Sequence, residues 1–196
     1  MEHLSALRQA VENLRDVKKP QRELFVCSQF LSNLGIAFTP SQLKPVPKAK
    51  EPPDVIFDEA RFEITEVLDQ GRQRDREYKT ILNLVESTGD LSHAVQLAEL
   101  KDIVPTEIGD RTRCAADKKA YDPATKASLD LLVYVNLTEH SFKRGAMPDP
   151  RSFAALGWRS LSVLFCWVSL VFYAAPGAPP FLQERAGQFT ERAFRT

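Results

Sequence analysis

The stretch Pro52-Pro53-Asp54-Val55-Ile56-Phe57 is followed, after a short polar turn, by Arg61-Phe62-Glu63-Ile64-Thr65-Glu66-Val67. Both stretches are rich in β-branched and aromatic residues, which predicts strands over 54–58 and 61–68. The short turn makes an antiparallel pair the expected arrangement. Because alternate strand residues face opposite sides of a sheet, Glu63, Thr65 and Val67 are expected on one face. Phe62, Ile64 and Glu66 are expected on the other.

Two acidic residues in this pair indicate a metal site. Asp54 opens the first strand, and Glu63 lies inside the second, between apolar residues. A carboxylate buried in a strand is costly unless it is paired or bound to a metal. Carboxylates on adjacent strands provide the oxygen ligands that Mg²⁺ prefers. The pattern therefore predicts a Mg²⁺ or Mn²⁺ site that acts on the phosphate of a nucleic acid.

The rest of the chain predicts an α/β fold. Leu4, Leu7, Val11, Leu14 and Val17 recur at helical spacing, and a second helix is expected between Pro20 and Gly35. The other expected elements are a short strand at 36–39, a loop at 40–53, a helix at 72–86, helical pieces interrupted by Pro105, Gly109 and Pro123 within 89–128, strands at 129–137, 161–166 and 168–173, a connection at 138–157, and a helical tail after Pro176. This order predicts one domain over residues 1–196, with helices flanking a central mixed β-sheet.

Composition limits the partners and the compartment. Twenty-six basic residues balance 26 acidic ones, so any nucleic-acid footprint must be local. Three widely spaced cysteines support neither a zinc site nor a disulfide framework. The apolar run Leu161–Ala175 is shorter than the roughly 20 residues of a membrane span and is expected to form two buried strands. We therefore expect a cytoplasmic protein that does not enter a membrane.

The pattern Pro53-Asp54 followed by Glu63-x-Thr65 resembles the PD-(D/E)XK nuclease superfamily, which has a restriction-endonuclease-like fold. The resemblance implies that Asp54, Glu63 and the backbone carbonyl of Ile64 bind the metal. It also implies an acid from the preceding helix, for which Glu23 is the first candidate and Glu12 the second. DNA would be the substrate, and the reaction would be hydrolysis of a phosphodiester bond.

More of the chain resembles an uncharacterised bacterial family labelled "putative endonuclease". The resemblance covers most of residues 20–185. It depends on Pro52-Pro53-Asp54, Phe62-Glu63, Glu66-Val67-Leu68-Asp69, Gly71-Arg72, Glu77-Tyr78, Tyr134-Val135-Asn136-Leu137, Gly157-Trp158-Arg159-Ser160 and Phe181-Leu182.

The chain departs from the nuclease pattern at Thr65, where the superfamily has a lysine. A hydroxyl group orients a water but cannot supply the positive charge of an ammonium group. Some superfamily members carry the basic group on the following helix, where Arg72 or Lys79 would take the role. Arg72, Arg74 and Arg76 would contact the nucleic acid, although a run of alternating charge is also typical of a solvated helix face.

Three readings of function stay open from the sequence. The first is a metal-dependent endonuclease in which Asp54, Glu63, Thr65 and Arg72 or Lys79 are catalytic. The second is a degenerate nuclease fold that binds nucleic acid or a protein without cleavage, in which case an ion pair with Arg61 or Arg72 would satisfy Glu63. The third is a structural or assembly protein whose segment 161–175 forms the exposed edge of a homodimer.

Overall fold

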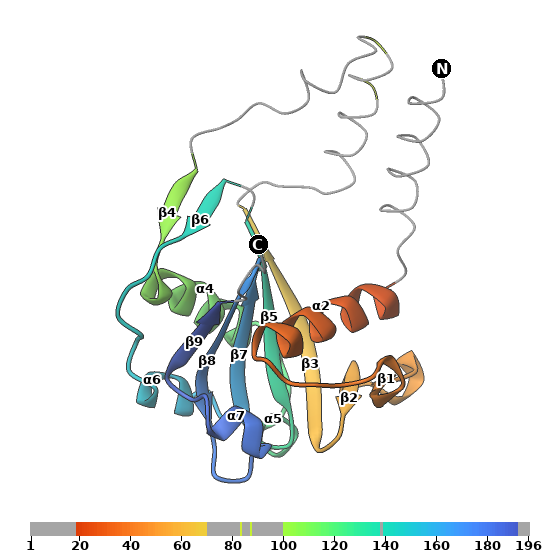
Figure 1. The fold of residues 1–196 in the computed structure, drawn as a ribbon. Coiled ribbons are helices and arrows are strands. Elements are labelled where there is room, and N and C mark those ends of the chain that lie inside the picture. The colour runs from red at the N-terminus through yellow and green to blue at the C-terminus, as the bar shows by residue number, and fades with distance from the viewer. Residues whose placement is uncertain (1–18, 70–82, 84–86, 88–99, 138, 192–196) are drawn as a thin grey trace.

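A computed structural model describes residues 19–69, 83, 87, 100–137 and 139–191 (Figure 1). Its helices and strands are, in chain order, α2 (Lys19–Asn33), η1 (Pro40–Gln42), β1 (Leu43–Pro45), η2 (Lys48–Lys50), β2 (Val55–Phe57), β3 (Ala60–Leu68), β4 (Lys101–Ile103), α4 (Pro105–Asp117), α5 (Pro123–Ala127), β5 (Asp130–Asn136), β6 (His140–Phe142), α6 (Arg151–Ala154), β7 (Ser160–Phe165), β8 (Val168–Ala174), α7 (Pro180–Gln183) and β9 (Gln188–Glu191).

A seven-stranded mixed sheet organises the fold in the order β1-β2-β3-β5-β7-β8-β9. The three central strands β3, β5 and β7 are parallel, while the outer pairs on both sides are antiparallel. β4 and β6 form a separate parallel pair. The α/β class and the mixed sheet flanked by helices agree with the sequence prediction, as does the antiparallel β2–β3 pair with its short turn.

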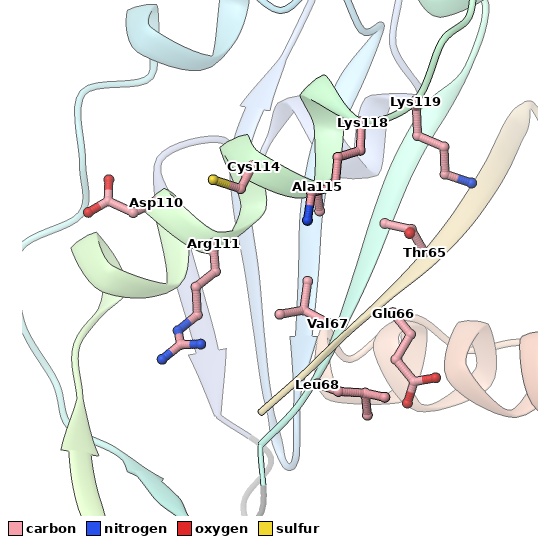
Figure 2. Close-up of a pocket in the computed structure, with 10 residues that line it drawn as sticks. All are labelled: Thr65, Glu66, Val67, Leu68, Asp110, Arg111, Cys114, Ala115, Lys118 and Lys119. Carbon is pink, nitrogen blue, oxygen red and sulfur yellow. The ribbon is translucent and has the colours of Figure 1, made fainter. Parts of the chain in front are cut away.

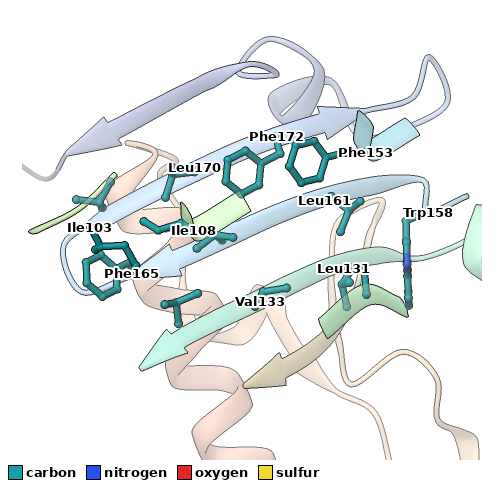
Figure 3. Close-up of a cluster of buried hydrophobic side chains, with 14 of the residues drawn as sticks. Ile103, Ile108, Leu131, Val133, Phe153, Trp158, Leu161, Phe165, Leu170 and Phe172 are labelled. Carbon is teal, nitrogen blue, oxygen red and sulfur yellow. The ribbon is translucent and has the colours of Figure 1, made fainter. Parts of the chain in front are cut away.

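One helix covers each face of the sheet (Figure 1). On one face, α2 buries Val26, Phe30 and Leu31 against residues that include Phe62 and Leu132. On the opposite face, α4 buries Ile108 and Ala116 against residues that include Leu131, Val133 and Leu161. Figure 3 shows this second cluster, in which the rings of Phe153 and Phe172 stack 4.6 Å apart. Leu131 and Leu132 thus enter different cores, as strand alternation requires.

Alternation along β3 follows the predicted pattern. Phe62 and Ile64 belong to the core beneath α2, whereas Val67 packs against the core beneath α4. The face assignment made from the sequence is therefore confirmed for the strand that carries Glu63 and Thr65.

Several local predictions were wrong. Residues 36–38 form no strand, since the backbone from Leu34 to Ile36 bonds back to the end of α2. The expected loop at 40–53 contains β1, which adds to the sheet through Val55 and Phe57. Over residues 176–191 the tail is α-helical only in α7 and then continues as β9, which pairs with β8. These strands contain three or four residues, too few to show a period in the sequence.

Gly109 lies inside α4, so the predicted interruption of the helix at this residue is wrong. A Cβ atom at this position would lie 3.1 Å from Phe153 and 3.2 Å from Pro148. The glycine therefore permits close packing of the helix against its neighbours, and the helix continues through it because packing outweighs its low helix propensity. Pro105 and Pro123 each begin a helix, as their missing amide donor allows.

The apolar segment 161–175 contributes β7 and most of β8, two buried strands, as predicted. Each strand has a neighbour on both sides, because β7 lies between β5 and β8, and β8 lies between β7 and β9. The segment cannot form an exposed dimer edge, so that form of the assembly reading is wrong. In the parts of the chain that the structure describes, no helix has both the length and the apolar character needed to cross a membrane.

Candidate functional site

The β2–β3 hairpin brings Asp54 and Glu63 together. The register pairs Val55 with Phe62, and the amide of Asp54, the residue before β2, also donates to the carbonyl of Phe62 at 2.9 Å. Asp54 therefore lies beside the part of β3 that carries Glu63. Both carboxylates are buried, with 2% and 3% of their residue surface exposed. The sequence predicted the two acids on neighbouring strands; in the structure Glu63 lies within β3 and Asp54 directly precedes β2.

Each oxygen of Asp54 accepts a hydrogen bond. Its Oδ1 accepts from the Nζ of Lys19 at 2.9 Å, and its Oδ2 accepts from the backbone amide of Ile64 at 2.8 Å. The amide and carbonyl of one strand residue point to the same edge. The carbonyl of Ile64 therefore faces the edge of β3 on which Asp54 lies.

Lys19, at the first turn of α2, joins three carboxylates. Its Nζ lies 3.3 Å from Glu23, 3.1 Å from Glu51 and 2.9 Å from Asp54. Partial burial lowers the pKa of this ammonium group, but its hydrogen bonds to Asp54 and Glu51 outweigh that effect and raise the pKa above its ordinary value. Lys19 therefore stays charged and holds α2 against the start of β2.

Glu23 lies one helical turn beyond Lys19 and is buried. Burial, together with the negative charge of Asp54, raises the pKa of Glu23 from 4.5 to about 7. The structure therefore brings the predicted helix acid into the electrostatic neighbourhood of Asp54. Its carboxyl group changes protonation state near neutral pH.

Glu63 has one satisfied oxygen and one orphaned oxygen. Its Oε1 accepts from the Nζ of Lys119 at 2.5 Å and from the hydroxyl of Tyr121 at 3.0 Å. Its Oε2 is buried and has no hydrogen-bond partner in the described part of the molecule. A buried polar atom left unpaired costs about 1–3 kcal/mol. This oxygen is consequently the strongest indication of a missing ligand in the site.

Tyr121 connects the two carboxylates electrostatically. Burial raises the pKa of its hydroxyl, and the negative charges of Glu63, Asp54 and Glu51 raise it further. The hydroxyl therefore stays protonated and donates to Glu63. The hydrogen bond from Tyr121 ties it to Glu63, while Asp54 and Glu51 act on it through their charge.

Thr65 follows Glu63 on the same face of β3 and lines a cavity of about 470 Å³ between that strand and α4 (Figure 2). Lys119 lines the same cavity. A smaller cavity of about 140 Å³, lined by Lys19, Glu23 and Ile64 among others, lies on the α2 side of β3 and also reaches Thr65. Thr65 therefore lies where the two sides of the candidate site meet.

The structure does not test every predicted site residue. Glu12, Arg72, Arg74, Arg76 and Lys79 lie outside the described residues. Arg61 is exposed, and Glu63 instead accepts hydrogen bonds from Lys119 and Tyr121. The predicted ion pair between Arg61 and Glu63 is thus wrong.

The oxygen atoms of the site are of the kind that binds a hard divalent cation, but Lys19 must move away from Asp54 before a cation can bind there. No group of three or more His, Cys, Asp or Glu side chains within the described ranges is positioned to hold a metal ion. Two carboxylates with a backbone carbonyl suffice for Mg²⁺, which keeps several waters. Glu63 Oε2, Asp54 Oδ1 and the Ile64 carbonyl are the corresponding atoms, and Lys19 now occupies Asp54 Oδ1.

Sequence reasoning missed four residues of the site: Lys19, Glu51, Lys119 and Tyr121. The Lys19–Glu23 spacing of one helical turn was a usable signal for the first of them. Lys119 and Tyr121 contact Glu63 across 56 and 58 residues, and nothing in their local sequence distinguishes them from surface residues.

Two comparisons place the chain among proteins of known sequence or structure. A family model described as "Putative endonuclease, protein of unknown function (DUF1780)" matches residues 2–194. A solved structure from Pseudomonas aeruginosa strain PAO1, described as a protein of unknown function of the monooxygenase superfamily, is similar with a TM-score of 0.68. The two chains are 27% identical, and the similarity covers 97% of this chain and 92% of the other. No curated protein matches the chain.

Proposed function

The chain belongs to the family described as "Putative endonuclease, protein of unknown function", and from this premise we propose that it is a Mg²⁺- or Mn²⁺-dependent endonuclease that hydrolyses phosphodiester bonds in DNA. A restriction-endonuclease-like fold is supported by the arrangement of α2 and α4 on opposite faces of the sheet that contains β2 and β3, because Asp54 and Glu63 then lie between these two helices.

The orphaned Oε2 of Glu63 is the observation that carries the proposal. Asp54, Glu63 and the carbonyl of Ile64 would hold the cation, with Glu23 nearby as the helix acid. A divalent cation, when bound, polarises the phosphodiester and lowers the pKa of water. The endonuclease description is preferred to the monooxygenase description of the similar structure because buried carboxylates and lysines serve phosphoryl chemistry directly.

Lys119 takes the electrostatic role that Thr65 cannot. Its ammonium group contacts Glu63, and its side chain lines the cavity that Thr65 also lines. A positive charge there stabilises negative charge that develops on a phosphate next to Glu63.

Glu23 and Lys19 belong to α2 and approach Asp54 from the other side of β3 than Lys119 does. A carboxyl group with a pKa of about 7 accepts and releases protons near neutral pH, which suits proton transfer to or from a leaving group or water. Lys19 holds Asp54 and Glu51 in place before a cation binds.

A degenerate fold that binds without cleavage is the second candidate, and one observation favours it. Lys19 on Asp54 and Lys119 on Glu63 already compensate both buried carboxylates with positive charge. Together with Thr65, this arrangement is also stable as a purely structural site.

The test is cleavage of single-stranded and duplex DNA with Mg²⁺, Mn²⁺ or EDTA. Wild type is compared with Asp54→Asn and Glu63→Gln. Asp102→Asn serves as the control, because the exposed carboxylate of Asp102 pairs with Lys143, the residue after β6, outside the candidate site. We expect wild type and Asp102→Asn to cleave DNA when a metal is present, and Asp54→Asn and Glu63→Gln not to cleave it. Cleavage that persists in both site variants, or no cleavage with any substrate, would remove the enzymatic reading and favour the degenerate one.

A further inference from the structure

The cavity between α4 and β3 has a one-sided charge. One stripe of α4 faces it with Arg111, Cys114 and Ala115, which are spaced at helical intervals. Lys118, which caps the helix, and Lys119 follow directly after it. Figure 2 shows Arg111 projecting from α4 and Lys119 projecting toward β3 near Thr65. Three cationic side chains thus gather along one wall.

The acidic residues of the cavity are already engaged. Asp110 forms an ion pair with Arg113, whose guanidinium also lies over the ring of Phe153. Glu66 accepts a hydrogen bond from Asn136 at 2.9 Å. Within the described ranges, Arg111 and Lys118 have no ion-pair partner. The amide of Asn136 leaves Glu66 negatively charged, but the two cations Arg111 and Lys118 outnumber this one charge. The remaining positive charge favours an anionic ligand.

The floor of the cavity is apolar. Val67 and Leu68 of β3 and Ala115 of α4 line it, and its volume of about 470 Å³ falls in the ordinary range for small-ligand sites. A cationic wall next to an apolar floor suits a ligand that joins a phosphate to a flat ring with apolar faces. A nucleotide has both parts.

Lys119 connects this cavity to Glu63. Its Nζ contacts Glu63 at 2.5 Å while its side chain lines the cavity. A nucleotide in the cavity would therefore lie directly beside the candidate metal site. A base that occupies an apolar cavity cannot at the same time be paired in a duplex.

We propose that the cavity between α4 and β3 binds one unpaired nucleotide of a single-stranded nucleic acid, with its phosphate on Arg111 and Lys118 and its base over Val67 and Leu68. This inference rests on the proposed function, and it deepens that function by assigning the substrate class. The preferred substrate is a single-stranded or frayed segment, and the neighbouring phosphate meets Glu63 and Lys119.

Binding is measured by anisotropy of a labelled single-stranded oligonucleotide in EDTA, so that cleavage plays no part. The test variant is Arg111→Ala/Lys118→Ala. The control is Lys44→Ala/Arg151→Ala, which removes the same charges at exposed positions outside the cavity. We expect the test variant to bind at least about tenfold more weakly. The slope of log binding constant against log salt concentration should become less steep by about 1.4, the value for two lost phosphate contacts on a single strand. The control should change neither quantity comparably, and thermal melting verifies that both variants fold.

Cysteine reactivity provides a second readout. Cys114 lines the cavity and is exposed, Cys166 is exposed in the β7–β8 turn, and Cys27 is buried. The single-stranded oligonucleotide should slow alkylation of Cys114, measured by peptide mass spectrometry, and leave the alkylation rate of Cys166 unchanged.

The outcomes separate this inference from the proposed function. Selective weakening by Arg111→Ala/Lys118→Ala and protection of Cys114 support the cavity even if no cleavage is found. Equal binding by the test and control variants overturns it even if wild type cleaves DNA. Equal binding of a blunt duplex and a single strand also overturns it, as does the absence of any binding by wild type.

Discussion

The Nζ atom of Lys119 lies 2.5 Å from the Oε1 atom of Glu63, although the two residues are 56 positions apart. The contact joins the end of α4 to the middle of β3. Thr65 stands where the nuclease pattern has a lysine and carries no charge. Lys119 supplies a positive charge beside Glu63 instead.

Replacing Lys119 with methionine should lower metal-dependent cleavage by about 10²–10³-fold, the typical loss when one electrostatic stabiliser of a transition state is removed. Lys44→Met is the matched control, since Lys44 is an exposed lysine outside both the cavity and the carboxylate site. The rates are measured at saturating Mg²⁺ and saturating DNA, so that kcat is compared and differences in binding do not contribute.

A lysine restored at position 65 tests the same role from the other side. Thr65 and Glu63 share one face of β3, so Thr65→Lys in the Lys119→Met background should recover part of the lost kcat. Unchanged activity in the double variant would mean that Lys119 is needed for structure and not for charge. The kcat of both variants is compared in one series.

Lys19 should compete with a divalent cation for Asp54. Its ammonium group occupies Asp54 Oδ1, so Lys19→Met frees that oxygen and removes a like charge from the site. We expect Mn²⁺ to bind at least about tenfold more tightly in the variant. Lys50→Met removes an exposed lysine beside Glu51 and serves as the control. Weaker binding in Lys19→Met would show that Lys19 organises the ligands and does not block them.

Glu23 should make stability fall as pH rises. Its pKa is raised from 4.5 to about 7 in the folded protein, so the folded state binds more protons than the unfolded state between these values. The free energy of unfolding then decreases from about pH 4.5 to about pH 7. Glu23→Gln should flatten this part of the profile in metal-free buffer, as measured by urea unfolding. Glu59→Gln, at an exposed turn residue, should leave the profile unchanged.

Asp130 should be structural and not catalytic. It is fully buried, forms an ion pair with Arg159, and accepts from Ser160 at 2.8 Å and from the amide of Arg61 at 2.9 Å. Asp130→Asn leaves Arg159 without its counter-charge and should destabilise the fold by about 3 kcal/mol in urea unfolding. The exposed pair of Asp149 and Arg151 is the control, and Asp149→Asn should change the free energy of unfolding far less than Asp130→Asn does.

The sequence predicted those parts of the fold whose cause is local. The β2–β3 hairpin follows from β-branched residues around a short polar turn, and the faces of Glu63 and Thr65 follow from strand alternation. Asp54 and Glu63 stood out because a carboxylate between apolar residues needs an explanation in any fold.

The partners of these carboxylates could not be predicted in the same way. Lys119 and Tyr121 reach Glu63 only because α4 packs across β3, a contact without a local sequence signal. The short strands β1 and β9 exist because neighbouring strands offer free edges, and their own three or four residues show no period.

The most direct test of the metal site is calorimetric titration of Mn²⁺ into wild type, Asp54→Asn and Glu63→Gln, with a single-stranded oligonucleotide present to complete the coordination shell. The account predicts one binding event in wild type and none in either variant, because the orphaned oxygen of Glu63 and the Oδ1 of Asp54 are the ligands. Absence of Mn²⁺ binding in wild type, or equal binding in all three proteins, would contradict it.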